Sequence, residues 1–166
     1  MNDGLQLESS HVDTLIQRLS SMVYRLAFSY ARNRNDAEDI MQEVFLRFVK
    51  YKPEFNDGEH EKAWFIKVTI NTAKSLHTSP WRKKTVLMPA EEVNAEKQED
   101  ISENSYIAEA VAKLNDKQRL CIHLFYYEGY AIVEIAQMTG FNESTVKSHL
   151  RRARECLKKE LGEANF

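Results

Sequence analysis

Hydrophobic residues recur along most of this 166-residue chain at the three- and four-residue spacing of one helical face. Three such stretches fall in the first half, at about residues 10–30, 35–52 and 59–77. Their inward positions are Val12, Leu15, Ile16, Leu19, Met22, Val23 and Leu26, then Ala37, Ile40, Met41, Val44, Phe45 and Phe48, then Trp64, Phe65, Val68, Thr72 and Leu76. No run alternates for long enough to predict a strand, so the first half is predicted to consist of helices.

Polar residues and prolines predict where these helices begin and end. Ser10 and Asn35 each have an acidic residue three positions further on, which is typical of a helix N-cap. Pro53 and Ser79-Pro80 end the second and third helices, because a proline ring cannot continue a helix.

Residues 87–105 are acidic and poor in aromatic residues, so they cannot bury enough apolar surface to fix their own structure. Short helical faces then follow from Ile107 to Leu114 and from Leu120 to Tyr127, and Gly129 closes the second. The sequence therefore predicts an all-α protein. Two small helical domains, at residues 1–86 and 106–166, are joined by an acidic flexible linker at 87–105.

Composition narrows the class of protein. No apolar run approaches the roughly 18 residues of a membrane-spanning helix, and the N-terminus carries no export signal. Cys121 and Cys156 form no CxxC pair, so they predict reduced thiols in a cytoplasmic protein. No catalytic or phosphate-loop motif occurs, and His60 has no second histidine at i+4. We therefore expect no enzyme, metal site or cofactor.

The net charge of −2 conceals a sorted distribution. Residues 1–61 sum to −4, 62–86 to +6, 87–106 to −5 and 107–166 to +1. Six bases against one acid fall between Lys147 and Lys159. Two basic stretches around an acidic spacer suit a polyanion contacted at two places, although charged runs are also typical of solvated helix faces.

Residues 132–154, IVEIAQMTGFNESTVKSHLRRAR, have the spacing of a helix-turn-helix. Ala136 lets two helices cross closely, Gly140 permits the tight turn, and Val146 anchors the second helix on the first. The first residues of that second helix, 143–145, have amides that can face a phosphate. Its predicted inward positions are Val146, Leu150, Ala153 and Leu157. A helical hairpin with a solvated basic face is the alternative interpretation.

Taken together, these motifs resemble the extracytoplasmic-function sigma factors, which belong to the sigma-seventy family of bacterial RNA polymerase. Their promoter-reading C-terminal domain is resembled by Glu134-Ile135-Ala136 and Thr145-Val146-Lys147-Ser148, with Leu150, Arg151, Ala153 and Arg154. Its lead-in is resembled by Leu114, Gln118-Arg119 and Tyr127-Glu128-Gly129. Their first conserved domain is resembled by Asp36-Ala37-Glu38-Asp39-Ile40, Gln42-Glu43-Val44-Phe45 and Trp64-Phe65 with Asn71.

The resemblance implies a transcription initiation factor that directs core RNA polymerase to promoters and does no catalysis itself. The implied polymerase partners are the basic clamp helices of the largest subunit and the flap. The implied contacts to the clamp helices are Asp36, Glu38, Asp39, Gln42, Glu43 and Phe45. The helix dipole also favours acids near a helix start, which explains Asp36 and Glu38 but not Glu43, two turns in.

For the minus-ten element, double-stranded and then melted, the resemblance points to residues 56–84. In the family, the matching loop holds a flipped base. The implied contacts are Asn56, Asp57, Lys62, Lys67, Asn71, Lys74, Arg82, Lys83 and Lys84. Trp64 is either a core residue or a stacking platform, and its spacing from Val68 favours the core. The sequence departs from the family at Ser79-Pro80-Trp81, where many members keep an unbroken basic helix.

The second helix of the helix-turn-helix is expected in the major groove of the minus-thirty-five element. Its implied contacts are Ser144, Thr145, Lys147, Ser148, His149, Arg151 and Arg152. The two arginines can donate in pairs to guanine edges, whereas His149 stands where an arginine is expected.

An anti-sigma factor, often membrane-anchored, is a further partner that the family implies. The alternative function is a stand-alone helix-turn-helix regulator with an N-terminal sensor domain. Such a regulator would need a ligand pocket or phosphoacceptor within residues 1–86, and it would bind DNA without polymerase.

Overall fold

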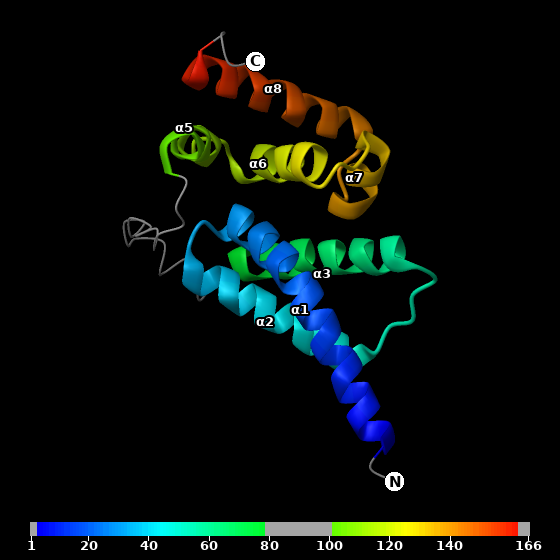
Figure 1. Ribbon diagram of the computed structural model, residues 1–166. Helices are drawn as coiled ribbons and strands as arrows, with labels where there is room; N and C mark the ends of the chain where they lie inside the picture. Colours follow the sequence, from blue (N-terminus) through cyan, green and yellow to red (C-terminus); the bar gives the residue numbers. More distant parts are fainter. Residues whose placement is uncertain (1–2, 79–100, 163–166) are drawn as a thin grey trace. The chain divides into compact units, whose positions relative to one another are not determined.

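The computed structural model describes residues 3–78 and 101–162, and all regular structure in these two ranges is helical, as the sequence predicts (Figure 1). The chain divides into unit 1, residues 1–87, and unit 2, residues 88–166. Unit 1 contains α1 (Asp3–Ala31), α2 (Arg34–Tyr51) and α3 (Gly58–Thr78). Unit 2 contains α5 (Ile101–Ala112), α6 (Asp116–Ile122), the π-helical turn η1 (His123–Tyr127), α7 (Ile132–Thr139) and α8 (Glu143–Leu161). No helix within the described ranges is long and apolar enough to span a bilayer.

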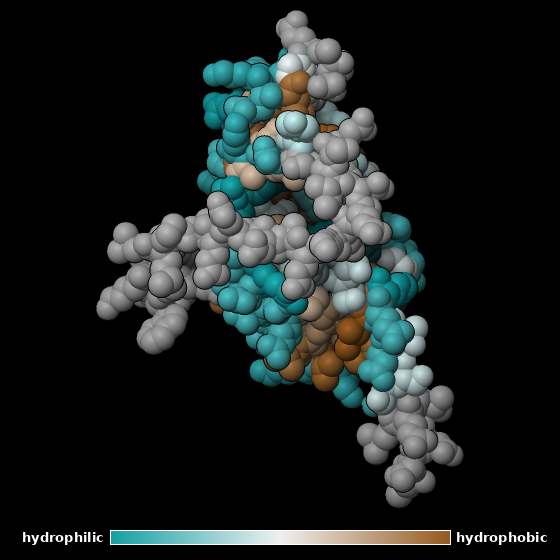
Figure 2. All heavy atoms as spheres, turned by 60° about the vertical axis from the view of Figure 1, so that its left-hand side comes forward, coloured by the Kyte–Doolittle hydropathy of each residue, from teal (hydrophilic) through white to brown (hydrophobic). Residues whose placement is uncertain are grey.

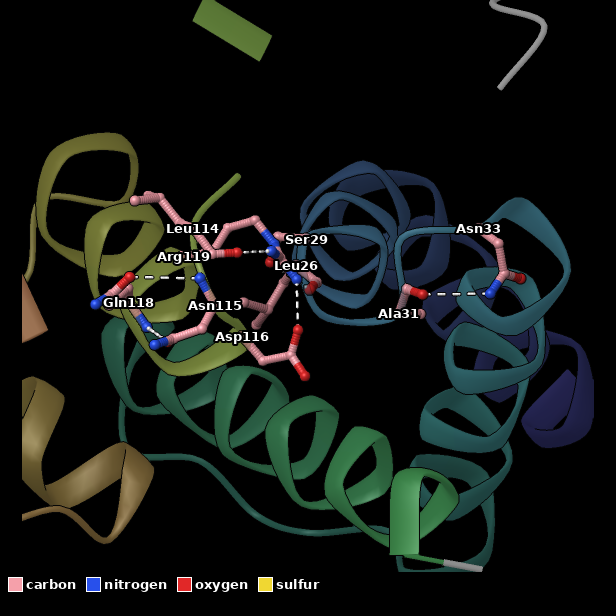
Figure 3. Close-up of polar contacts among 9 residues, drawn as sticks. All are labelled: Leu26, Ser29, Ala31, Asn33, Leu114, Asn115, Asp116, Gln118 and Arg119. Atoms are coloured by element: carbon pink, nitrogen blue, oxygen red, sulfur yellow. Dashed lines mark hydrogen bonds and ion pairs between the residues drawn. The ribbon is translucent and has the colours of Figure 1, made fainter. Parts of the chain in front are cut away.

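Both predicted N-caps are wrong. α1 begins at Asp3, so Ser10 lies inside the helix, where its carbonyl accepts a hydrogen bond from the Thr14 hydroxyl at 2.9 Å. α2 begins after Asn33, not after Asn35: the Asn33 side chain accepts from the Asp36 amide at 2.8 Å. Asn33 also donates to the Ala31 carbonyl at 3.2 Å (Figure 3). Two asparagines stand two positions apart, and the sequence alone does not separate them.

The predicted linker is too long at its C-terminal end, because residues 101–105 belong to α5. The rest of that segment, from 87 to 100, lies outside the described residues. So does the predicted stop of the third helix at Ser79-Pro80; α3 is described as far as Thr78.

Aromatic rings fill the core of unit 1. Phe65 is fully buried, and its ring centroid lies 5.5 Å from that of Phe45 and 5.3 Å from that of Phe48. Trp64 packs edge-on against Phe48 at 6.2 Å and Phe55 at 5.8 Å, so its ring belongs to this aromatic cluster, as its spacing favours. The buried face of α3 consists of Phe65, Ile66, Thr69, Ile70, Thr72 and Ala73, while the predicted core residues Val68 and Leu76 are only half-buried.

In unit 2, α8 provides the central hydrophobic stripe. Val146, Leu150, Ala153 and Leu157 are all buried, as predicted, and Ala153 and Leu157 cluster with Ala110 and Leu114. η1 widens the helical turn after α6, because the Glu128 amide donates to the His123 carbonyl at 3.0 Å, five residues back.

Buried Arg119 fixes the junction between α5 and α6. Its side chain is 5% exposed and donates to the Leu114 carbonyl at 2.6 Å and to Asp116 Oδ1 at 2.7 Å (Figure 3). Beside it, Asn115 caps α6 by accepting from the Gln118 amide at 2.9 Å (Figure 3). A seven-residue helix is thus held in place mainly by polar contacts at its first turn.

Candidate nucleic-acid and partner interfaces

Three of the acidic residues predicted to bind polymerase have partners within or beside α2. Asp36 accepts from the Asn33 side chain at 2.8 Å, Glu38 pairs with Arg34 at 2.7 Å, and Glu43 pairs with Arg47 at 2.8 Å. Exposed pairs of this kind stabilise a helix by only about 0.3–0.5 kcal/mol, so they hold the acids weakly. Each acid nevertheless has a structural role, including Glu43, which the dipole did not explain.

A stripe along the outside of α2 combines polar and apolar residues. Asp39, Gln42, Leu46 and Val49 are all exposed and lie at the three- and four-residue spacing of one face; we call them the α2 stripe. Leu46 is 58% exposed and Val49 46%. Figure 2 shows that hydrophobic residues do reach the surface between hydrophilic ones.

Sequence reasoning missed the apolar half of the α2 stripe, although its signal was present. Leu46 and Val49 are out of phase with the buried Val44 and Phe48 of the same helix. Leu46 also lines a hollow of about 430 Å³, together with Glu43, Arg47, Lys50 and Tyr51. An apolar residue on the polar side of an amphipathic helix suggests a contact outside the fold.

Phe45 is not part of this surface, and its assignment to polymerase binding is wrong. It is 9% exposed and its ring packs against Phe65 in the core. The family motif gives the order of residues along α2, whereas the side of the helix on which Phe45 lies is decided by packing against α3.

Three of the predicted minus-ten residues share one side of α3. Lys67 and Asn71 are exposed and Lys74 is half-buried, and their positions fall within about 60° around the helix axis; we call them the α3 polar face. Lys62 lies about 140° away from Lys67, half-buried on the side of the core. The structure therefore does not bring Lys62 together with the other three. Arg82, Lys83 and Lys84 lie outside the described residues.

The loop before α3 is held by its own hydrogen bonds. Asp57 Oδ1 accepts from the His60 amide at 2.7 Å, and the Asn56 amide donates to His60 Nδ1 at 3.2 Å. The Phe55 ring contacts the His60 ring edge-on at 5.6 Å. Asp57 thus caps α3, and the exposed side chain of Asn56 is the better placed of the two predicted DNA contacts.

The helix-turn-helix has the turn that its sequence predicts. Gly140 has a φ of 78° and ends α7, and its amide donates to the Ala136 carbonyl at 3.0 Å. Only glycine adopts this left-handed conformation at little cost. The start of α8 differs from expectation because Asn142 caps it, accepting from the Thr145 amide and the Ser144 hydroxyl, both at 2.8 Å. The Thr145 amide is therefore not open to a phosphate, as the sequence had suggested.

The outer side of α8 carries most of the predicted minus-thirty-five residues. Ser144, Lys147, Arg151 and Arg152 are exposed, while Thr145, Ser148 and His149 are half-buried. Arg151 pairs with Glu155 at 2.9 Å, and both side chains are 62% exposed. Such a pair is weak, so the Arg151 guanidinium can exchange it for a nucleic acid.

His149 differs from its neighbours because it is packed. Its ring centroid lies 5.4 Å from that of Phe141, and Nδ1 is buried without a hydrogen-bond partner. Burial, together with the positive charges of Lys117 and Arg152, holds the pKa of His149 below its usual value.

Arg154 joins α8 to η1. Its Nε donates to the Tyr126 hydroxyl at 2.6 Å, and its guanidinium lies over the rings of Phe125 and Tyr126 at 5.7 and 5.6 Å. The sequence motif includes Arg154 but gives it no role. The contacts show that it fixes the recognition helix against the aromatic turn η1.

Comparisons with known proteins agree with this arrangement of two helical units. The family model "Sigma-70 region 2" matches residues 15–83, and "Sigma-70, region 4" matches residues 104–157. RNA polymerase sigma factor SigV of Bacillus subtilis is 33% identical over 140 residues, 83% of each chain. ECF RNA polymerase sigma factor BldN of Streptomyces coelicolor is 27% identical over 154 residues, 88% of this chain and 58% of BldN.

Two solved structures share the fold. One is the sigma factor RpoE in complex with the anti-sigma factor NepR from Bartonella quintana, with a TM-score of 0.75, 21% identity, and coverage of 90% of this chain and 95% of RpoE. The other is CnrH in complex with the cytosolic domain of CnrY, with a TM-score of 0.62, 18% identity, and coverage of 92% and 88%.

The chain therefore belongs to the sigma-70 family of RNA polymerase sigma factors, as the sequence predicts. Its role is that of a transcription initiation factor that directs RNA polymerase to promoters. Sigma factors are DNA-binding proteins rather than enzymes. The match of residues 15–83 to a sigma region excludes the N-terminal sensor domain of the stand-alone regulator.

Proposed function

We propose that unit 1 binds core polymerase through the α2 stripe and contacts minus-ten DNA through the α3 polar face, while α8 of unit 2 reads the minus-thirty-five element. The working domains are residues 1–86 and 106–166, the second extended to Ile101 where α5 begins. The observation that carries this division is the α2 stripe. It is an exposed row, acidic at one end and apolar at the other, on the outside of a helix whose other side is fully packed.

The α2 stripe suits docking on a basic helical surface such as the clamp helices. Asp39 adds charge that guides encounter and fixes orientation more than it adds affinity. Leu46 and Val49 supply the apolar area, which contributes roughly 25 cal/mol per Å² removed from water. The apolar half is therefore expected to carry most of the binding free energy.

Two variants of α2 test this docking surface. We expect Leu46→Asp to weaken binding of core polymerase at least about thirtyfold, since a central interface residue contributes about 2 kcal/mol or more. Asp39→Arg should have a smaller effect, mainly on the association rate and its salt dependence. Pull-down and titration with labelled core polymerase measure both, with Arg152→Ala as the control. Unchanged affinity in both variants would leave α2 with structural roles only.

For α8, we expect Arg151→Ala and Arg152→Ala to weaken promoter recognition without weakening polymerase binding. Each bidentate contact to a base provides about 1–3 kcal/mol of discrimination. Promoter binding by the reconstituted holoenzyme measures the loss. If either variant abolishes association with core polymerase, the division of roles between the two units is wrong.

The experiment that tests the whole proposal is transcription in vitro from a library of genomic fragments, using core bacterial polymerase with and without this chain. New transcripts that start at shared two-element sites are expected, and they would give the promoter sequence. Silence, together with DNA binding by the chain alone, would contradict the proposal.

We further propose an anti-sigma factor as a partner in the cytoplasm, anchored in the membrane. Support comes from the solved complexes of RpoE with NepR and of CnrH with the cytosolic domain of CnrY. Such a partner is expected to cover the α2 stripe or the basic face of α8. Purification of the tagged chain from detergent-solubilised cells should recover a stoichiometric membrane protein, and recovery of polymerase alone would count against it.

A further inference from the structure

Three basic or titratable side chains come together in unit 2 from two different helices. Lys117 lies in the first turn of α6, and His149 and Arg152 lie one turn apart on α8. Lys117 and Arg152 are both exposed, and both are near enough to act electrostatically on the His149 ring. Lys117 has no part in the helix-turn-helix motif, so the sequence pattern gave no reason to associate it with α8.

The packing of His149 determines what its ring can offer. Phe141, from the turn between α7 and α8, lies against the ring, and Nδ1 is buried without a partner. A buried N–H without an acceptor costs about 1–3 kcal/mol, so a neutral ring keeps its hydrogen on the other nitrogen. His149 therefore presents Nε2 as an N–H donor, while its packed position suits it poorly for reaching across a groove to a base.

The electrostatic surroundings of His149 favour an anion. The charged groups that act on the ring are both bases, Lys117 from α6 and Arg152 from α8, and Phe141 is uncharged. Their mutual repulsion disfavours a proton on His149, and a negative group placed among the three would relieve that repulsion. Two cations and one N–H donor also match the oxygens of a phosphate group.

We propose that Lys117, His149 and Arg152 together bind one phosphate of the promoter backbone, beside the bases that α8 reads. This inference rests on the proposed function, because it requires unit 2 to lie on DNA. A phosphate contact positions the protein and carries no sequence information. α6 thereby joins the promoter interface, and His149 acts on the backbone and not on a base.

The salt dependence of promoter binding tests the site. The full chain is assembled with core polymerase, and binding to a promoter fragment from the library experiment is measured over a series of salt concentrations. Lys117→Ala should reduce the slope of log K against log salt by about 1, and weaken binding equally for different minus-thirty-five sequences. Lys159→Ala, an exposed lysine in the last turn of α8, is the matched control and should leave the slope unchanged. A wild-type slope in Lys117→Ala would overturn the site.

The pH dependence provides a second readout. A phosphate beside His149 raises its pKa, so binding takes up a proton and promoter affinity increases as the pH falls from about 8 to about 6. His149→Gln keeps an N–H donor but cannot be protonated, so this increase should disappear. An increase as large as that of the wild type would overturn the role of His149.

The two proposals fail in different ways. Wild-type holoenzyme that selects no promoter would refute the proposed function, and the phosphate site with it. Normal promoter selection with an unchanged slope in Lys117→Ala would refute the phosphate site alone.

Discussion

The two units reach the same helical class by different means. Unit 1 consists of helices of 29, 18 and 21 residues packed around an aromatic core. Unit 2 includes helices of only seven and eight residues, and individual groups fix their ends: Arg119 before α6, Gly140 after α7 and Asn142 before α8. A long helix gains its stability from its buried face, whereas a short one depends on its first and last turns. Loss of one polar group should therefore matter more in unit 2.

Native reporters distinguish the two units. Both tryptophans, Trp64 and Trp81, fall within residues 1–87, and both cysteines, Cys121 and Cys156, fall within 88–166. Burial raises the pKa of Cys121 to about 11, so at pH 8 its thiol stays protonated while unit 2 is folded. Tryptophan fluorescence thus follows unit 1, and labelling of Cys121 follows the opening of unit 2.

The largest effect is expected for Phe65→Ala in unit 1. Removing a fully buried ring that contacts Phe45 and Phe48 should lower the free energy of unfolding by about 3–5 kcal/mol. Urea unfolding followed by tryptophan fluorescence measures this loss. The rate of Cys121 labelling should not change, and an equal loss in both signals would show that the units unfold as one.

A single polar residue should have the next largest effect, in unit 2. Arg119→Ala leaves the Leu114 carbonyl without its donor and Asp116 without its partner, and should lower stability by about 2 kcal/mol. Labelling of Cys121 at pH 8 should then be about thirtyfold faster. Lys113→Ala removes an exposed pair with Glu160 and is the control. An Arg119→Ala rate equal to the control rate would mean that the junction is held by burial alone.

Gly140→Ala tests the turn between α7 and α8. No atom lies within 4 Å of the added Cβ, so the cost comes from the backbone φ of 78° alone, about 1–2 kcal/mol. Cys121 labelling measures it. Gly140→Asn should cost less, because asparagine adopts the left-handed region more readily than alanine. If alanine and asparagine cost the same, the φ value is not the cause.

The smallest effect is expected for a capping-turn acid of unit 1. Glu38→Ala removes an exposed pair with Arg34, and the free energy of unfolding should change by no more than about 0.5 kcal/mol. Tryptophan-detected urea unfolding measures it against the wild type. A loss comparable with that of Arg119→Ala would remove the contrast between the two units.

The sequence predicts buried faces better than it predicts helix ends. The inward residues of α8 were all identified, and Met41 is the one predicted core residue of α2 that is only half-buried. Burial itself imposes this periodicity, so it is visible in the sequence. The caps at Ser10 and Asn35 were wrong because several nearby residues satisfy the same pattern.

The candidate surfaces were predicted in part. The motif identified α2 and α8, but it placed Phe45 on a surface that packing reserves for the core, and it grouped Lys62 with residues on another side of α3. The surroundings of His149 could not be predicted, because Lys117 reaches it through the packing of α6 against α8. Contacts between distant segments have no local sequence signal.

The widened turn η1 restricts how this chain can change length during evolution. The bond from the Glu128 amide to the His123 carbonyl spans one residue more than an α-helical bond. Deleting one residue between them would restore an ordinary α-helix and rotate everything that follows by about 100° relative to α6. The contact between Arg154 and Tyr126 would be lost, and α8 would point in another direction. Descendants of this sequence can therefore substitute residues in η1 more readily than they can lose one.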